Sequence, residues 1–229
     1  MIEDPPLVTL RRPTRRPTPA QIEALKGVQT GFLVDAMGGR GALDYRIRVL
    51  AGLPADFCGV ALTCHAGPCD NLAVFAMLPV LTGGDVMMVA TDSYVATAVA
   101  GDLLLGMARN QGAAAFVTDG CVRDIPGLLG VGLPCFSAGV TPNSPARNGP
   151  GTVGLPVVVG GVAVETGDIV VGDIDGVVVV PFDRIDAVIA RLPDIRRAEA
   201  ALDAKVKAGL TVPDFARAIF DQGRVREVG

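Results

Sequence analysis

The sequence of 229 residues contains no tryptophan, a single histidine and few lysines. The lysines, Lys26, Lys205 and Lys207, all fall in predicted helices away from strand ends. A Schiff-base mechanism needs a lysine that a pocket desolvates, so this chemistry is disfavoured. His65 has no serine or cysteine motif beside it, and both a Gly-x-Ser-x-Gly elbow and a Gly-x-x-x-x-Gly-Lys loop are missing. We therefore expect neither a nucleophilic triad nor nucleotide phosphate chemistry, and we interpret His65 as structural.

Charge and long apolar runs are also scarce. Only 19% of the residues are charged and the net charge is −4, which gives no footprint for nucleic acid. The basic cluster, four arginines within residues 11–16, is interleaved with prolines and predicts a solvated, extended N-terminal arm over residues 1–17. The apolar run of residues 72–84 contains a proline and is too short to cross a membrane. We expect no nucleic acid and no membrane as partners, and the chain start lacks the pattern of a signal peptide.

The cysteines are Cys58, Cys64, Cys69, Cys121 and Cys135. An odd number without a secretory signal favours reduced thiols and a cytoplasmic protein. Cys64-His65 with Cys69 matches no standard spacing of zinc ligands, and no second Cys/His pair could close a tetrahedral site. We interpret the thiols as small buried side chains.

Three segments in the middle of the chain predict a strand, a helix and a second strand. Residues 85–90 form a short apolar run, and residues 101–112 place apolar side chains at helical spacing. Residues 113–118 are apolar throughout, as in a strand buried on both faces. This order gives a right-handed crossover unit in a parallel sheet.

The other segments add an antiparallel part and outer helices. A capping box at Thr18 predicts a helix directly after the arm. Residues 156–181 alternate apolar runs with glycine-rich turns and predict an antiparallel β-meander, followed by helices over residues 183–208 and 212–222. The fold class is therefore α/β, with a parallel βαβ part, a β-meander and C-terminal helices, in a single domain over residues 18–229.

Two pairs of residues are predicted to meet at one edge of the sheet. Gly101-Asp102 begins the middle helix, and Arg123-Asp124 closely follows the second strand. The helix and the strand run back over similar lengths, so both pairs should lie at the carboxyl ends of the strands, where open α/β sheets bind ligands. The alternative is that Asp102 is an ordinary helix N-terminal residue and Arg123-Asp124 a surface ion pair in a turn.

The residue types at this edge suit an oxygen-rich anion held together with a hard divalent cation. Arg123 can bind a carboxylate or an enolate oxygen through its forked donors. Asp124 can hold Mg²⁺ or Mn²⁺ largely through water, and Asp102 can orient such a water. The amides that can receive a carboxylate at the helix N-terminus belong to Gly101, Asp102, Leu103 and Leu104. We expect Asp119 and Gly120 to shape the turn, and Cys121 to serve packing.

These residues resemble the signature of the RraA-like family, whose enzymatic members are divalent-metal pyruvate aldolases acting on 4-hydroxy-4-methyl-2-oxoglutarate and 4-carboxy-4-hydroxy-2-oxoadipate. The motif is GDLL at residues 101–104 followed by DGCVRD at residues 119–124, and the similarity extends to TGFLVDAMGGRG at residues 30–41. The sequence departs from the family at Thr91-Asp92 and Ile125-Pro126, which we expect to line the site region.

The resemblance implies a swivelling β/β/α sandwich that assembles as homotrimers, often paired into hexamers. It implies that Asp124 binds the metal, that Arg123 binds the substrate and stabilises the pyruvate enolate, and that residues 101–104 take the substrate carboxylate. Asp102 would help a water act in proton transfer. A glutamate from the neighbouring subunit's C-terminal helix joins such sites, and Glu199 is the candidate. The alternative for Glu199 is a solvent-facing helix residue.

The leading functional hypothesis is a class II pyruvate aldolase, a lyase for 4-hydroxy-2-oxo dicarboxylic and tricarboxylic acids, with oxaloacetate decarboxylation as a side activity. The alternative is a non-enzymatic regulator that binds and inhibits a ribonuclease, as relatives named RraA do. The presence of Asp102, Arg123 and Asp124 together favours chemistry. A methyltransferase, another label used in the family, is disfavoured because the sequence has no glycine-rich methyl-donor loop.

Overall fold

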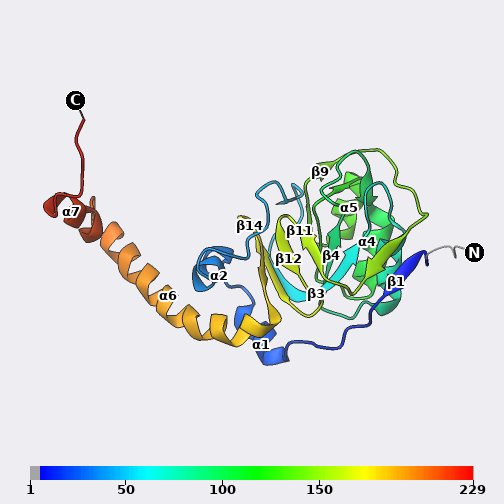
Figure 1. Cartoon of the computed structure of the whole chain (residues 1–229), viewed down its shortest axis with the longest axis horizontal. Helices are drawn as coiled ribbons and strands as arrows, with labels where there is room; N and C mark the ends of the chain where they lie inside the picture. The colour runs from blue at the N-terminus through cyan, green and yellow to red at the C-terminus, as the bar shows by residue number, and fades with distance from the viewer. Residues whose placement is uncertain (1–5, 229) are drawn as a thin grey trace, which may run out of the picture.

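The computed structural model describes residues 6–228 and is built around a nine-stranded mixed sheet (Figure 1). Seven strands follow one another in the order β1-β10-β3-β4-β6-β8-β2, and the hairpin β13–β14 joins the sheet where β13 pairs with β3. The strand bounds are β1 Val8–Leu10, β2 Arg48–Val49, β3 Phe57–His65, β4 Asp85–Ala90, β6 Ala115–Thr118, β8 Cys135–Ser137, β10 Gly151–Val153, β13 Ile169–Asp173 and β14 Gly176–Val180. The mixed α/β fold class is therefore confirmed.

The centre of this sheet is the predicted parallel unit. Strands β3, β4, β6 and β8 run parallel, and β4 and β6 are neighbours with Val86 opposite Ala115. The helix α4, Asp102–Asn110, lies between them in sequence, so the predicted crossover is confirmed. All of β4 is buried, with Met87 packing on one face of the sheet and Met88 on the other.

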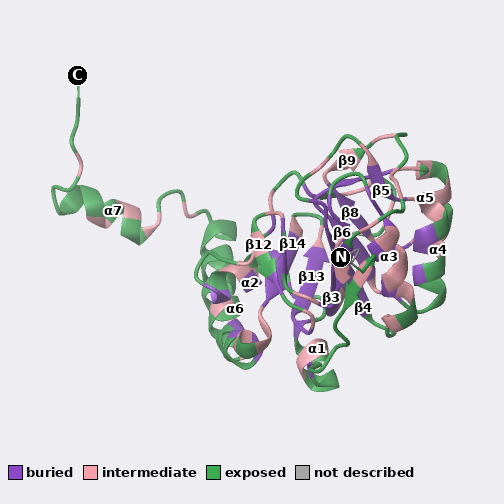
Figure 2. Cartoon of the chain, turned by 45° about the vertical axis from the view of Figure 1, so that its right-hand side comes forward, coloured by how far each residue is buried: buried purple, intermediate pink, exposed green. Residues whose placement is uncertain are grey.

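Two different layers cover the two faces of the sheet (Figure 2). One face packs against α4 and the short helices α3, Leu72–Met77, and α5, Ile125–Val131. The other packs against the hairpin of β11, Val157–Val159, and β12, Val162–Val164. Two short 3-10 helices complete the secondary structure: η1, Leu78–Val80, directly follows α3, and η2, Phe182–Arg184, comes after β14.

The predicted single meander over residues 156–181 is wrong, because the segment forms two separate hairpins. Strands β11 and β12 make a two-stranded sheet of their own, whereas β13 and β14 belong to the main sheet. The turn between the hairpins is held by Asp168, which is buried and accepts hydrogen bonds from the amides of Glu165 and Phe182. These bonds redirect the chain from one layer to the next.

A third, three-stranded sheet was not predicted. Strands β5, Ala98–Ala100, β7, Cys121–Val122, and β9, Gly139–Val140, pair in parallel in the order β5-β7-β9. Strands of this length carry too few residues to show a period in the sequence. Strands β5 and β7 lead directly into the predicted site residues, and β9 leads into the loop of residues 141–150.

The N-terminal arm is docked onto the domain rather than solvated throughout. Residues 1–5 of the predicted arm lie outside the described residues. From there β1 pairs in parallel with β10, Arg15 forms an ion pair with Glu165, and Arg16 Nη1 lies 2.5 Å from Asp85 Oδ1. Arg15 and Arg16 stay exposed, as the solvated interpretation requires, but their ion pairs also attach the arm to the domain. The predicted capping box of the helix α1, Pro19–Leu25, is confirmed.

The C-terminal helices project from the body of the molecule (Figure 1). The first part of α6, Ile185–Lys207, packs against α1 and α2, Thr30–Ala36, whereas the rest of α6 and α7, Asp214–Asp221, are largely exposed (Figure 2). The exposed apolar side chains on these two helices are Leu202, Val206, Phe215, Ile219 and Phe220. Within residues 6–228, no helix has the length and apolar character that crossing a membrane requires.

The contact between Arg16 and Asp85 makes a prediction about stability. Burial raises the pKa of the Asp85 carboxyl, and the Thr82 amide and Arg16 oppose that rise. A raised pKa in the folded state means that Asp85 favours folding most when protonated, and that this contribution is lost as the pH rises. Arg16→Ala should therefore destabilise the protein by about 1 kcal/mol at neutral pH, and by less as the pH falls and the carboxyl takes up its proton.

Urea unfolding at several pH values measures this difference, with Arg12→Ala as the control because Arg12 is an exposed arginine of the same arm. A penalty for Arg16→Ala that grows as the pH falls would contradict the assignment.

Candidate functional site

Three parallel strands end at one cavity, and each leads into a segment that lines it. Strand β5 leads into Gly101-Asp102, β7 into Arg123-Asp124, and β9 into the loop of residues 141–150. Ala100 and Val122 are direct partners, so the two predicted pairs follow matched positions on neighbouring strands. The Arg123 amide donates to the Ala100 carbonyl at 3.1 Å, which fixes that alignment.

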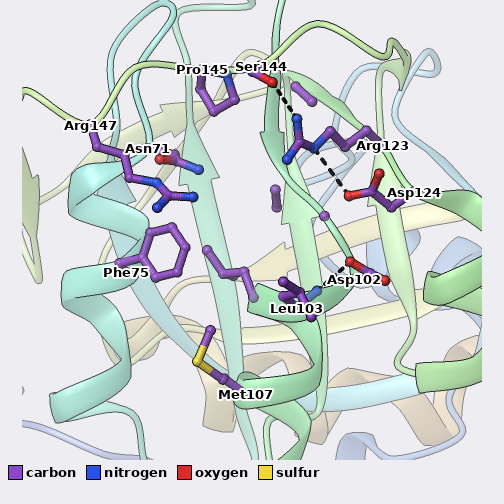
Figure 3. A pocket seen from close by; sticks show the side chains of 14 residues that line it. Asn71, Phe75, Asp102, Leu103, Met107, Arg123, Asp124, Ser144, Pro145 and Arg147 are labelled. Carbon is purple, nitrogen blue, oxygen red and sulfur yellow. Dashed lines mark hydrogen bonds and ion pairs between the residues drawn. The ribbon is translucent and has the colours of Figure 1, made fainter.

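The cavity has a volume of about 370 Å³ and opens to the surface (Figure 3). Its lining residues are Asn71, Phe75, Ala98, Ala100, Gly101, Asp102, Leu103, Leu104, Met107, Arg123, Asp124, Ser144, Pro145 and Arg147. All the residues predicted from the two motifs, from Gly101 to Leu104 with Arg123 and Asp124, therefore lie around one space. The predicted convergence is confirmed, while the individual roles of these residues stay predictions.

Two glycines let the starts of α4 and α5 interlock. A Cβ atom at Gly101 would collide with the Asp124 carboxylate, so that carboxylate rests directly against the start of α4. A Cβ atom at Gly127 would lie 2.6 Å from the Asp102 Cβ, so the Asp102 side chain rests in the same way against α5. Each carboxylate is thus placed by a glycine on the other helix.

Arg123 is held between two oxygen partners. Its Nη1 donates to Ser144 Oγ at 2.5 Å, and its Nε lies 3.2 Å from Asp124 Oδ2 (Figure 3). The side chains of Arg123 and Asp124 are 34% and 43% exposed, so both stay within reach of a ligand in the cavity. Asp124 has a left-handed backbone with φ of 63°, which aspartate tolerates better than most residues. This turn points the carboxylate back toward α4.

The start of α4 offers fewer free amides than the sequence predicted. Gly101 is the N-cap and has no side chain to bind the amides of the first turn. The Leu103 amide, however, donates to Asp102 Oδ1 at 2.7 Å, so it is not free for a ligand. The Asp102 side chain is therefore also held at the start of α4 through its Oδ1 atom. Among the described residues, its Oδ2 atom accepts no hydrogen bond.

The donor atoms in the cavity fit a hard divalent cation. Asp124 and Asp102 supply carboxylate oxygens to the cavity. Within residues 6–228, however, no group of three or more His, Cys, Asp or Glu side chains is arranged so that it could hold a metal ion. Mg²⁺ commonly binds through one or two carboxylates and keeps several waters. Two carboxylates beside an open space are the donor types that Mg²⁺ or Mn²⁺ prefers, and binding of either cation here stays a prediction.

The side of the cavity opposite Arg123 and Asp124 was missed from the sequence. There Arg147 stacks over Phe75, with its Cζ 4.7 Å from the ring centroid, and Asn71 lies next to them (Figure 3). Asn71 is 5% exposed, and its Oδ1 atom is buried without a hydrogen-bond partner among residues 6–228. The sequence holds only a weak signal for this side, because Arg147 falls in a loop rich in proline and asparagine.

Glu199 does not line this cavity. It lies on α6 and borders a separate cleft with Gln29, Phe32 and Asp56. The prediction that Glu199 reaches the site of a neighbouring subunit stays a prediction.

Thr91-Asp92 and Ile125-Pro126, where the sequence departs from the family pattern, do not line the cavity as expected. Thr91 instead binds Asp119, whose Oδ1 accepts from the Thr91 amide at 2.7 Å, and Pro126 lies in the first turn of α5. This bond confirms that Asp119 shapes a turn.

Cys121 is buried, as expected for a thiol that serves packing. Cys69 is exposed, so the prediction that the thiols are buried is wrong for Cys69.

Comparison with known proteins identifies relatives of the same kind along most of the chain. Residues 30–179 match the RraA-like family, described as Aldolase/RraA. A protein of Halalkalibacterium halodurans named "Putative 4-hydroxy-4-methyl-2-oxoglutarate aldolase" is 35% identical over 160 residues, which span 70% of this chain and 76% of that protein.

Solved structures share the fold. The RNA-processing inhibitor RraA from Thermus thermophilis is 30% identical, with a TM-score of 0.62 over 67% of this chain and 93% of that one. RraAS2 of Streptomyces coelicolor, described as an unusual member of the RNase ES inhibitor RraA protein family, is 27% identical, with a TM-score of 0.73 over 83% of this chain and all of that one.

The packing of Asp124 against Gly101 predicts a metal-binding defect that leaves the fold intact. Gly101 has an extended backbone, with φ of −146° and ψ of −173°, so alanine fits the conformation. Its Cβ would displace the end of the Asp124 side chain and would also press on Arg123 Cγ at 3.3 Å. Gly101→Ala should weaken Mn²⁺ binding about tenfold or more, as changes around metal ligands do, with little change in thermal stability.

Calorimetric titration with Mn²⁺ tests this prediction. Gly130→Ala in α5 is the control, because a Cβ there meets no atom within 4 Å. Equal Mn²⁺ affinity in Gly101→Ala and the wild type would show that Asp124 is not positioned in this way.

Proposed function

Because the chain belongs to the RraA-like family, we propose that it is a divalent-metal-dependent lyase that cleaves 4-hydroxy-2-oxo acids and releases pyruvate. The observation that carries the proposal is the convergence of Asp102, Arg123 and Asp124 on one cavity. The relative named as an aldolase supports the reaction type. Substrates such as 4-hydroxy-4-methyl-2-oxoglutarate fit the class.

The cleavage breaks the bond between C3 and C4 of the substrate. The C4 hydroxyl loses its proton and C4 becomes a carbonyl, while the bonding electron pair moves to C3 and gives the enolate of pyruvate. A proton then returns to C3. Oxaloacetate decarboxylation would release carbon dioxide and pass through the same enolate, so we propose it as a side activity.

Arg123 is the residue that we assign to the developing negative charge. Its guanidinium is fixed by Ser144 and Asp124, and it keeps further N–H donors for the 2-oxo oxygen of the substrate. Donors held in place before the reaction stabilise charge that appears in the transition state. The substrate carboxylate is assigned to the start of α4, next to Gly101.

Asp124 and Asp102 are the residues that would hold Mg²⁺ or Mn²⁺, Asp124 directly and Asp102 through water. The cation, when bound, supplies Lewis-acid polarisation of the 2-oxo acid. Asp102 has one oxygen fixed by the Leu103 amide, so its other oxygen is oriented to hold the water that carries protons.

A second function is that of a regulator that binds a ribonuclease, because the similar Thermus protein is described as an RNA-processing inhibitor. Both functions fit one fold. The assembled set of Asp102, Arg123 and Asp124 favours chemistry here, because an inhibitor surface needs no such set in a cavity.

The direct test is pyruvate release from 4-hydroxy-4-methyl-2-oxoglutarate, followed with lactate dehydrogenase. We expect turnover with Mg²⁺ or Mn²⁺, its loss in chelator, and a fall of at least about 100-fold in kcat for Arg123→Ala, as for loss of a charge-stabilising donor. Asp124→Ala should lose metal-dependent turnover, with Asp183→Ala, at an exposed aspartate outside the cavity, as its control. Full activity in chelator, or tight ribonuclease binding without turnover, would reverse the ranking of the two functions.

We further propose that the chain forms homotrimers or hexamers, in which Glu199 of one subunit completes the site of the next. The exposed apolar side chains of α6 and α7 are consistent with such contacts. Random reassembly of an equal mixture of inactive Asp124→Ala and Glu199→Ala chains should then restore about a quarter of all sites, because those sites receive both native residues. Light scattering gives the mass of the assembly, and an absence of regained activity in a confirmed mixed trimer would contradict the shared site.

A further inference from the structure

The hydroxyl of Ser144 reaches Arg123 from a segment that neither sequence motif includes. Its Oγ accepts a hydrogen bond from Arg123 Nη1 at 2.5 Å, while Asp124 Oδ2 lies 3.2 Å from Arg123 Nε (Figure 3). These contacts engage Nη1 and Nε, so they leave the Nη2 donors of the guanidinium for a ligand. Ser144 therefore takes part in deciding which donors of Arg123 face the cavity.

The loop that carries Ser144 is tied to the domain on both sides of this residue. Before it, the Asn143 side chain donates to the Ala96 carbonyl at 2.8 Å. After it, the Ala146 amide donates to the Cys69 carbonyl at 2.8 Å. A proline directly follows Ser144, and a proline restricts the backbone of the residue before it. The hydroxyl is thus presented from a fixed point.

Ser144 and Asp124 hold Arg123 in different ways. Asp124 attracts the guanidinium by charge, and a guanidinium that is free to turn tends to pair with both oxygens of a carboxylate. In the structure the ion pair joins Nε to Oδ2, and the bond from Nη1 to Ser144 limits how far the guanidinium can rotate toward the other oxygen. The hydroxyl thus opposes a closer pairing of Arg123 with Asp124.

A neutral partner matters for Arg123 once Asp124 holds a cation. A carboxylate that binds Mg²⁺ or Mn²⁺ has less charge left for the guanidinium beside it, and the two positive charges repel each other. The Ser144 hydroxyl has no net charge, so its bond to Arg123 does not weaken in this way. Ser144 can therefore keep Arg123 in the cavity while Asp124 is engaged.

We propose that Ser144 is a positioning residue, which keeps the Arg123 guanidinium facing the cavity and separate from the Asp124 carboxylate. Without the hydroxyl, the guanidinium turns onto Asp124, where it competes with the cation and no longer meets the 2-oxo oxygen of the substrate. This inference rests on the proposed function, because it takes Arg123 to bind the developing charge and Asp124 to hold the cation.

Calorimetric titration with Mn²⁺ alone tests the separation of Arg123 from Asp124 without any turnover. Ser144→Ala should weaken Mn²⁺ binding about fivefold, because the released guanidinium competes for the Asp124 carboxylate. Ser144→Thr keeps the hydroxyl and should bind Mn²⁺ as the wild type does. Asn148→Ala is the matched control, because Asn148 is exposed in the same loop but does not line the cavity. Mn²⁺ binding in Ser144→Ala that is as tight as in the wild type, or tighter, would overturn the proposal.

The same titration shows whether Ser144 acts through Arg123. In an Arg123→Ala background, Ser144→Ala should not change the Mn²⁺ affinity further, because no guanidinium is left to position. A loss as large as in the native background would mean that the hydroxyl acts on the cation site by another route, and it would overturn the positioning role.

The kinetics of pyruvate release distinguish positioning from a purely structural role. Ser144→Ala should lower kcat for 4-hydroxy-4-methyl-2-oxoglutarate about fivefold with KM nearly unchanged, since Arg123 is assigned to charge that appears in the transition state. Ser144→Thr should restore kcat. The melting temperature of Ser144→Ala should stay at that of the wild type, because the hydrogen bond is exposed to solvent. An early melting transition, or a rise in KM at constant kcat, would contradict the assignment.

Failure of this inference is separable from failure of the proposed function. If the wild type binds no Mn²⁺ and releases no pyruvate from 4-hydroxy-2-oxo acids, the proposed function fails and the positioning role falls with it. If the wild type binds Mn²⁺ and releases pyruvate, and Ser144→Ala matches it in both measurements, Ser144 has no positioning role and the lyase stands.

Discussion

The site depends on the interlocked starts of α4 and α5. Gly101 leaves room for the Asp124 carboxylate, and Gly127 leaves room for the Asp102 side chain, so each helix places the carboxylate of the other. The small parallel sheet β5-β7-β9 fixes the two helix starts at matched positions through Ala100 and Val122. The placement of the two carboxylates, and of Arg123 beside Asp124, follows from this packing.

The cavity has two sides of different chemistry, which come from different parts of the chain. One side carries Arg123 and the two carboxylates and suits a 2-oxo acid with a hard cation. The other carries Asn71 and Arg147, and the Arg147 guanidinium lies over the Phe75 ring. The third strand, β9, joins them, because its loop supplies both Ser144, which holds Arg123, and Arg147. A family that includes a named aldolase and named RNase inhibitors shares the fold, so it is the side chains in this cavity that favour catalysis.

The sequence predicted the part of the fold that has a clear period, and the part of the site that lies at helix and strand ends. The buried run of β4 and the helical spacing of α4 identified the crossover unit, and hence the meeting of Gly101-Asp102 with Arg123-Asp124. It could not predict β5, β7 and β9, which are too short to show alternation, or the split of residues 156–181 into two hairpins, which depends on the buried Asp168. Arg147 and Asn71 were missed because a loop of prolines and a single amide carry no periodic signal. The attachment of the arm to the domain was not predicted, because Arg16 pairs with Asp85, which lies far away in sequence.

The central claim is that this cavity forms and stabilises the enolate of pyruvate. Its most direct measurement is the exchange of the C3 protons of pyruvate with deuterium, followed by NMR in deuterated buffer with Mg²⁺ or Mn²⁺, since this step needs no C4 half of the substrate and no carbon–carbon bond cleavage. The account predicts metal-dependent loss of the methyl proton signal with the wild type and none above the solvent rate with Arg123→Ala. Exchange that persists in Arg123→Ala, or that never exceeds the solvent rate in the metal-loaded wild type, would contradict it.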